Sequence, residues 1–151
     1  MNPDFSDLLR EFAAARVRFL VVGAHALGVH GEARATGDLD VWVANDRENA
    51  ERVYRALVRF GAPTENISIE DFTSDDLIFQ MGVVPRRVDV LTAIDGVAFD
   101  EAWNDRVETM VDGVTVPVIG RHAFLANKRA VGRPKDLGDI ESVLRHHPED
   151  R

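Results

Sequence analysis

The chain has 151 residues, 45% of them hydrophobic, and a formal net charge of −8 at pH 7. This length suits a single domain, residues 1–151, with a substantial core, and the charge argues against a protein that holds nucleic acid by bulk electrostatics. The lack of cysteine excludes disulfides and thiolate metal sites. With no long apolar run and no basic leader, we expect a cytoplasmic protein without a membrane partner.

Apolar periodicity predicts the elements of the first half of the chain. In chain order these are a helix at 4–15, a strand at 17–23, a short helix at 24–31, a strand at 38–44 and a helix that Asn45 caps and that ends at Phe60. Gly23 and Gly31 bound the short helix, and Gly61 follows the last one.

The second half begins with a polar loop over 61–76 that includes a short helical turn. The pattern then predicts strands at 77–83 and 86–92 around a tight turn, a short helix at 99–106, a hairpin at 107–119 around Asp112-Gly113, helices at 121–132 and 135–147, and a frayed tail at 148–151. This order is typical of a mixed α/β (α+β) domain, with a sheet of about four or five strands flanked by helices and with C-terminal helices.

Carboxylates at the start of a buried strand are the first candidate site. Asp38 and Asp40 are two residues apart, so in a strand both side chains project from the same face. Asp89 lies inside another apolar strand and joins them if the two strands are neighbours. Three such carboxylates can hold two Mg²⁺ ions. Alternatively, the pair is a solvated strand start and Asp89 only pairs with Arg86 or Arg87.

A strand–glycine–helix turn precedes these acids. The first N–H groups of the helix that follows Gly23-Ala24 have no partner within the helix, so a phosphate can bind there. By itself this turn is weak evidence, because most such turns bind nothing.

Taken together, these segments resemble the DNA polymerase β-like nucleotidyltransferase superfamily. The matching pieces are "VGA" at 22–24, "DLDV" at 38–41 and "VDV" at 88–90. More narrowly, the chain resembles small bacterial nucleotidyltransferase-like proteins related to abortive-infection and toxin–antitoxin transferases. That resemblance runs from about Phe19 to Ile140 and rests on Arg34, Thr36, Asp38 and Asp40 and on Lys128, Arg133, Asp136 and Asp139.

The resemblance implies an Mg²⁺-dependent enzyme that moves an NMP from an NTP, such as ATP, to a hydroxyl of an RNA 3′ end, a protein or a small molecule. Asp38, Asp40 and Asp89 would be catalytic and would bind two Mg²⁺ ions, or Mn²⁺ in their place. The nucleotide-binding residues would be Gly23, Ala24, Arg34, Thr36, Lys128 and Arg133. The partner would be an antitoxin or a second copy of the chain.

Several residues have a second interpretation. The family often has Ser where this chain has Ala24, and alanine has no hydroxyl to bind a phosphate. Arg34 would bridge Asp38 instead, and Lys128 would be a solvated helix residue. The segment from Arg133 to Asp139 would then be a structural salt-bridge network. The alternative functions are a non-catalytic nucleotide-binding module or partner subunit and, more weakly, a purely structural interaction protein.

Overall fold

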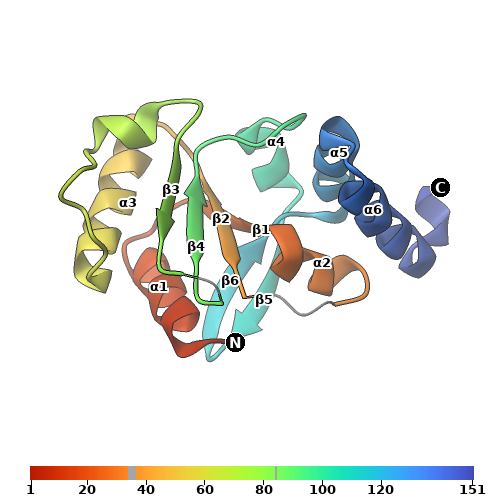
Figure 1. Cartoon of the computed structure of the whole chain (residues 1–151), viewed down its shortest axis with the longest axis horizontal. Coiled ribbons are helices and arrows are strands. Elements are labelled where there is room, and N and C mark those ends of the chain that lie inside the picture. The colour runs from red at the N-terminus through yellow and green to blue at the C-terminus, as the bar shows by residue number, and fades with distance from the viewer. Residues whose placement is uncertain (34–36, 84) are drawn as a thin grey trace.

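A computed structural model describes residues 1–33, 37–83 and 85–151 and contains one six-stranded sheet with helices around it (Figure 1). The spatial order of the strands is β3-β4-β2-β1-β6-β5. Their bounds are β1 Phe19–Val22, β2 Leu39–Val43, β3 Ile78–Met81, β4 Val88–Leu91, β5 Val107–Val111 and β6 Val114–Val118.

The sheet is mixed, and it is larger than the four or five strands expected. Strand β2 pairs in parallel with β4 and antiparallel with β1, and β1 in turn pairs in parallel with β6. The single register pair Val21↔Val118 brings the β5–β6 hairpin into the main sheet. All six strands fall inside the runs that the sequence predicts, but local patterns carry no information about which runs share a sheet.

The helices also follow the predicted order. They are α1 Pro3–Ala14, α2 Gly23–His30, α3 Arg47–Phe60, α4 Phe99–Asn104, α5 Arg121–Val131 and α6 Pro134–His146, with 3₁₀ turns η1 Glu70–Thr73 and η2 Pro148–Asp150. Among the helices of the described residues, none combines the length and the apolar character needed to cross a bilayer.

Two local predictions are wrong. Asp46 caps α3 in place of Asn45, because the Asp46 carboxylate accepts the Asn49 N–H at 3.1 Å while the Asn45 amide donates to Asp75 at 2.7 Å. The tail is also not frayed, because η2 is tied back by an ion pair between Arg121 and Asp150. The turn predicted between β3 and β4 includes Val84, which lies outside the described residues.

The two faces of the sheet differ in what covers them. Leu39, Val41 and Val43 of β2 are fully buried on one face, which α1 covers through a Phe12–Phe19 ring contact of 5.4 Å. In Figure 1 helices α1 and α3 lie together near β3, whereas α5 and α6 lie beside α2 at the other end of the molecule. Alternation along β2 therefore places Asp40 on the face away from α1.

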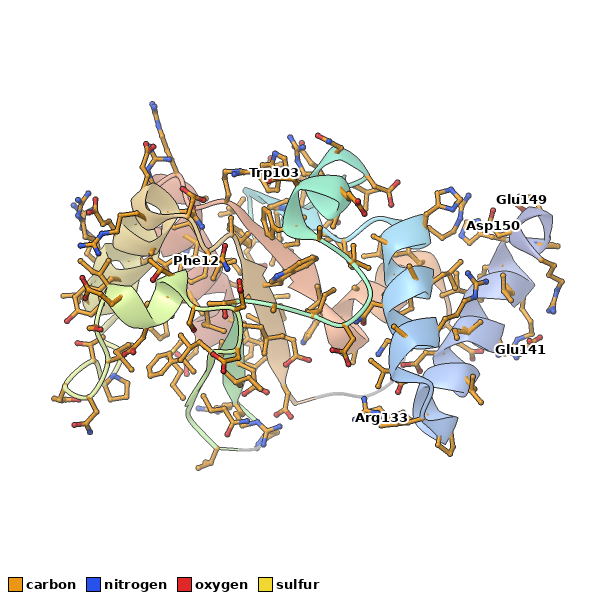
Figure 2. The ribbon with its side chains drawn as sticks, turned by 90° about the horizontal axis from the view of Figure 1, so that it is seen from above. Phe12, Trp103, Arg133, Glu141, Glu149 and Asp150 are labelled. Carbon is orange, nitrogen blue, oxygen red and sulfur yellow. The ribbon has the colours of Figure 1, made fainter. Side chains whose placement is uncertain are left out.

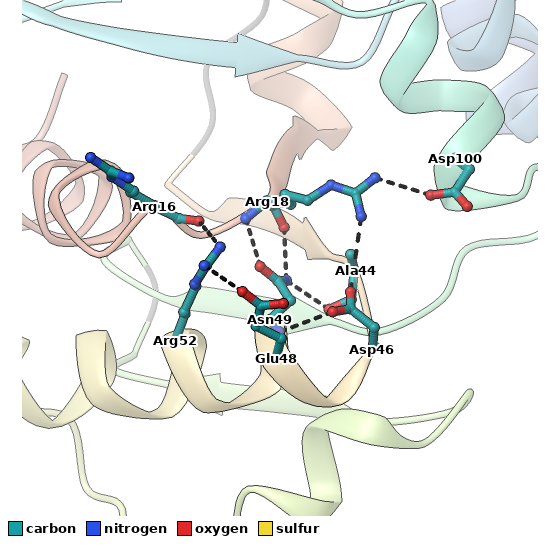
Figure 3. A network of polar contacts seen from close by, with 8 residues as sticks. All are labelled: Arg16, Arg18, Ala44, Asp46, Glu48, Asn49, Arg52 and Asp100. Atoms are coloured by element: carbon teal, nitrogen blue, oxygen red, sulfur yellow. Dashed lines mark hydrogen bonds and ion pairs between the residues drawn. The ribbon is translucent and has the colours of Figure 1, made fainter.

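A buried amide joins the ends of β1 and β2 to α3. The Asn49 side chain accepts the Arg18 N–H at 2.7 Å and donates to the carbonyl oxygens of Arg18 at 3.1 Å and Ala44 at 2.7 Å. Figure 3 shows this amide between the two chain segments, with ion pairs of Arg18 and Arg52 around it. Since Asn49 is 2% exposed, its three backbone partners have no water to replace it.

We predict that Asn49→Ala lowers the free energy of unfolding by about 3 kcal/mol, because it leaves buried backbone groups without partners. Asn45→Ala is the control, since the Asn45 amide bonds to Asp75 near the surface. Urea unfolding followed by circular dichroism measures both. Equal losses for the two variants would contradict the role assigned to Asn49.

Candidate active site

The structure brings Asp38, Asp40 and Asp89 together on one side of the sheet. Asp40 is the register partner of Asp89 in the parallel β2–β4 pair. Asp38 precedes β2 by one residue, and the Leu39 N–H donates to the Arg87 carbonyl at 3.0 Å, which extends the pairing towards Asp38. The placement of Asp89 beside the first two acids, expected only if these strands are neighbours, is thus confirmed.

Gly23 lies directly beside Asp40, at the junction of β1 and α2. Val22 is the register partner of Asp40, and Gly23 follows it with a φ of +68°, which glycine adopts without strain. A Cβ at this position would collide with the Asp40 Oδ2 atom. The turn therefore requires glycine for two reasons, its backbone angle and the closeness of the carboxylate.

The first turn of α2 is the candidate anion site. The Val22 cap residue makes no side-chain hydrogen bond to the first turn, so Gly23 and Ala24 begin the helix without a side-chain cap. Backbone N–H groups at such an end attract anions. Ala24 supplies no hydroxyl, so a phosphate bound here would depend on backbone donors alone.

His25, in the first turn of α2, contacts the backbone of the acid pair. Burial lowers the pKa of its imidazole, and a hydrogen bond with the Asp38 backbone opposes that shift. The ring also packs edge-on against Phe5 at 5.9 Å. A neutral His25 therefore helps to fix the loop end from which Asp38 projects.

The surroundings of Asp40 disfavour ionisation of its carboxyl group. Burial raises the pKa of the Asp40 carboxyl from 3.8 to about 6, and the charges of Asp89 and Asp38 add to the shift. Arg87 acts in the opposite direction but does not outweigh them. Near neutral pH the site therefore concentrates negative charge that the protein compensates only in part.

Among the described residues, Arg87 is a cation that compensates part of this charge. One guanidinium nitrogen donates to the Asp38 carboxylate at 2.9 Å, and the Nε atom lies 3.4 Å from the Asp89 carboxylate. The alternative in which Asp89 pairs with Arg87 is therefore also present in the structure. The alternation rule that predicts the face of the acids also predicts the face of Arg87, because Arg87 is two residues before Asp89.

The donor set suits Mg²⁺, which prefers hard carboxylate oxygens. The raised pKa of Asp40 marks negative charge that a divalent cation would neutralise, and the missing Cβ of Gly23 lets the Asp40 carboxylate lie against the turn. Within residues 1–33, 37–83 and 85–151, however, no three carboxylate or imidazole side chains are already gathered for metal binding. Arg87 instead engages two of the three acids.

Lys128 lies in a second charged cluster, between α5 and α6. Its ammonium is 3.3 Å from the carboxylates of both Asp136 and Asp139, and the side chain is only 11% exposed. The prediction of a solvated Lys128 is thus wrong, because two buried acids hold the ammonium. Its role in nucleotide binding stays a prediction.

Arg133 closes the same cluster from the surface. Its guanidinium donates to Asp136 at 2.7 Å, and this hydrogen bond is the main reason why the pKa of Asp136 falls to about 2. Figure 2 shows Arg133 at the α5–α6 turn, far from Phe12 at the other end. The structural network foreseen for this segment is therefore present. Arg34 and Thr36, also predicted to bind nucleotide, lie outside the described residues.

The cluster adjoins the segment that leads to the acid pair. The Ser142 hydroxyl of α6 accepts the Glu32 N–H at 2.8 Å, and Asp139 lines a hollow together with Glu32 and Ala33. Helix α6 therefore anchors one end of the connection between α2 and β2. Of the motif residues, Asp139 lies next to this connection.

Comparison with known proteins supports the fold. No family model matches the chain, and no curated protein does. Among solved structures, the fold is similar to that of a candidate nucleotidyltransferase from Thermotoga maritima, with a TM-score of 0.54 and 14% identity over 100% of this chain and 96% of that one. The chain therefore has a nucleotidyltransferase-like fold, as the sequence predicts.

We predict that Asp40→Asn stabilises the metal-free protein above pH 6 and less so as the pH falls towards 4. A carboxyl whose pKa rises on folding disfavours the folded state once it is ionised, so its cost grows between pH 3.8 and about 6 and persists above. At about 1.4 kcal/mol per pKa unit, the gain near pH 7.5 is at most about 3 kcal/mol. Thermal unfolding in EDTA across this range measures it, with Asp76→Asn as an exposed control. A gain that does not shrink towards pH 4 would refute the assignment.

The two lysines of the chain give a matched pair for the second cluster. We predict that Lys128→Met lowers the free energy of unfolding by about 3–5 kcal/mol, because it removes the buried ammonium that contacts both Asp136 and Asp139. Lys135→Met changes an exposed side chain and should leave stability almost unchanged. Chemical denaturation of both variants provides the measurement, and a small loss for Lys128→Met would show that the network contributes little.

Proposed function

We propose that this protein is an Mg²⁺-dependent nucleotidyltransferase that moves an NMP from an NTP to a hydroxyl and releases pyrophosphate. The observation that carries the proposal is the row formed by Val22, Asp40 and Asp89 across three strands, with Gly23 at its end. This row brings a carboxylate cluster against the open start of a helix. Such a pairing suits a ligand that combines a divalent cation with phosphates.

Each part of the site has a distinct task in this reaction. Asp38, Asp40 and Asp89 would hold the ions, which when bound neutralise the phosphate charge and lower the pKa of the attacking hydroxyl. The backbone N–H groups at Gly23 and Ala24 would orient the β- and γ-phosphates. Catalysis would then consist mainly of positioning the reactants and compensating charge.

The acceptor would be a hydroxyl of an RNA 3′ end, a protein or a small molecule. The net charge of −8 disfavours a large RNA footprint unless a partner chain supplies basic surface. An antitoxin or a second copy of this chain would be such a partner, and a toxin–antitoxin role rests on family analogy.

A second candidate function is nucleotide binding without transfer, as a sensor or partner subunit. The observation that favours it is Ala24, which provides no hydroxyl at the start of α2 and leaves phosphate binding to the backbone N–H groups. This candidate predicts NTP binding with no transfer of label to any acceptor.

Label transfer from each α-labelled NTP in the presence of Mg²⁺ or Mn²⁺, with RNA, protein and small-molecule acceptors, tests the proposal. We predict that Asp38→Asn/Asp40→Asn reduces transfer at least about a thousandfold, since positioned charge stabilisation supplies several kcal/mol. The matched control is Asp75→Asn/Asp76→Asn, which neutralises two exposed aspartates of the loop after η1. Equal transfer by the two double variants would reject the enzyme. Binding without transfer by the unmodified protein would favour the second candidate.

A further inference from the structure

We propose that Arg87 is an internal counter-ion of the acid cluster, which an entering divalent cation displaces onto the phosphates of the nucleotide. The inference rests on the proposed function, because it takes Asp38, Asp40 and Asp89 as the cation ligands. It adds to the site a residue that makes metal binding and nucleotide binding depend on each other.

The contacts of Arg87 are those of a cation held by two of the three acids. Its guanidinium reaches Asp38 at 2.9 Å and Asp89 at 3.4 Å. The Arg87 side chain is 35% exposed, against 13% for Asp89, so part of Arg87 is in contact with solvent while its Nε atom is buried beside the acids. A divalent cation approaching from solvent meets this group at the oxygens that it must bind.

The two cations therefore compete. Carboxylate oxygens that coordinate Mg²⁺ directly cannot at the same time keep a close hydrogen bond to a guanidinium in the same direction. Binding of the ion and release of Arg87 from Asp38 and Asp89 are then one equilibrium, and the coupling between them is reciprocal. Removal of Arg87 should strengthen binding of the ion alone.

Once released, the Arg87 side chain would contact phosphates bound at the nearby Gly23 turn. The register places Val22, Asp40 and Asp89 in one row, so Gly23 and Arg87 lie at neighbouring ends of β1 and β4, two strand spacings or about 10 Å apart. A triphosphate at the Gly23 turn would extend across that gap. The planar guanidinium fork that fits carboxylates also fits phosphates, so Arg87 can exchange one partner for the other.

Arg86 provides the matched control. It neighbours Arg87 in sequence, but alternation turns it to the other face, where it lines an apolar hollow together with Met81 and Val88. Arg86→Gln and Arg87→Gln thus remove the same charge from adjacent positions, and only the second removes it from the acid cluster.

The first measurement is Mn²⁺ binding to the full chain, followed by the electron paramagnetic resonance signal of the free ion. We expect Arg87→Gln to bind Mn²⁺ about tenfold more tightly than the unmodified protein, a factor equal to about 1.4 kcal/mol, and Arg86→Gln to bind it as the unmodified protein does. Equal affinity of the two variants would overturn the counter-ion. Mn²⁺ binding that Asp38→Asn/Asp40→Asn leaves unchanged would instead reject the metal site and with it the proposed function.

The second measurement is binding of a non-hydrolysable ATP analogue at saturating Mn²⁺. Here we expect the opposite sign, with Arg87→Gln binding the analogue about tenfold more weakly because the phosphates lose a charged partner. Unchanged or tighter binding would overturn the transfer of Arg87 to phosphate. If Arg87→Gln does not fold, Arg87→Lys replaces it in both measurements, since it keeps the charge and removes the fork. Unchanged affinities for Arg87→Lys would then overturn the proposal.

Discussion

The parallel register between β2 and β4 determines where every acid of the candidate site lies. Leu39 faces Val88 and Val41 faces Val90, so these apolar side chains fall on the face that α1 and α3 cover, while Asp40 and Asp89 fall on the other face. A slip of one residue would turn Asp40 towards that core and expose Leu39 and Val41. Burial of these apolar side chains thus fixes the register, and the register in turn fixes the carboxylates. The core and the site are specified by the same alternation.

Two clusters of buried charge in the described part of the chain differ in how their charges are paired. In the α5–α6 cluster, Lys128 and Arg133 meet Asp136 and Asp139, and the pKa of Asp136 is lowered to about 2. In the sheet cluster, Arg87 contacts Asp38 and Asp89, and the pKa of Asp40 rises to about 6. The paired charges of the α5–α6 cluster hold the two helices together. The excess negative charge of the sheet cluster disfavours the folded state, and such charge is typical of sites that bind ligands.

Whether a feature of the fold or the site could be predicted from the sequence depends on how far apart in the chain the interacting residues lie. Alternation within "DLDV" and "VDV" predicts the faces of Asp38, Asp40 and Asp89, because side-chain direction is a local property of a strand. The same rule points to Arg87, which the sequence offers only as one possible partner of Asp89. The six-stranded sheet depends on the contact of Val21 with Val118, and the choice of cap for α3 depends on Asp75, to which the Asn45 amide donates while Asp46 caps the helix. Neither is encoded in a short window of sequence.

The helix start beside the partly compensated acid cluster has no side-chain cap. A capping side chain on α2 would favour the folded state in isolation, whereas the missing Cβ of Gly23 is what lets the Asp40 carboxylate lie against the turn. Backbone donors at the start of α2 therefore lie beside a carboxylate cluster whose charge Arg87 neutralises only in part. A cation bound to phosphates, as in the proposed function, would match the carboxylates and the backbone donors at once.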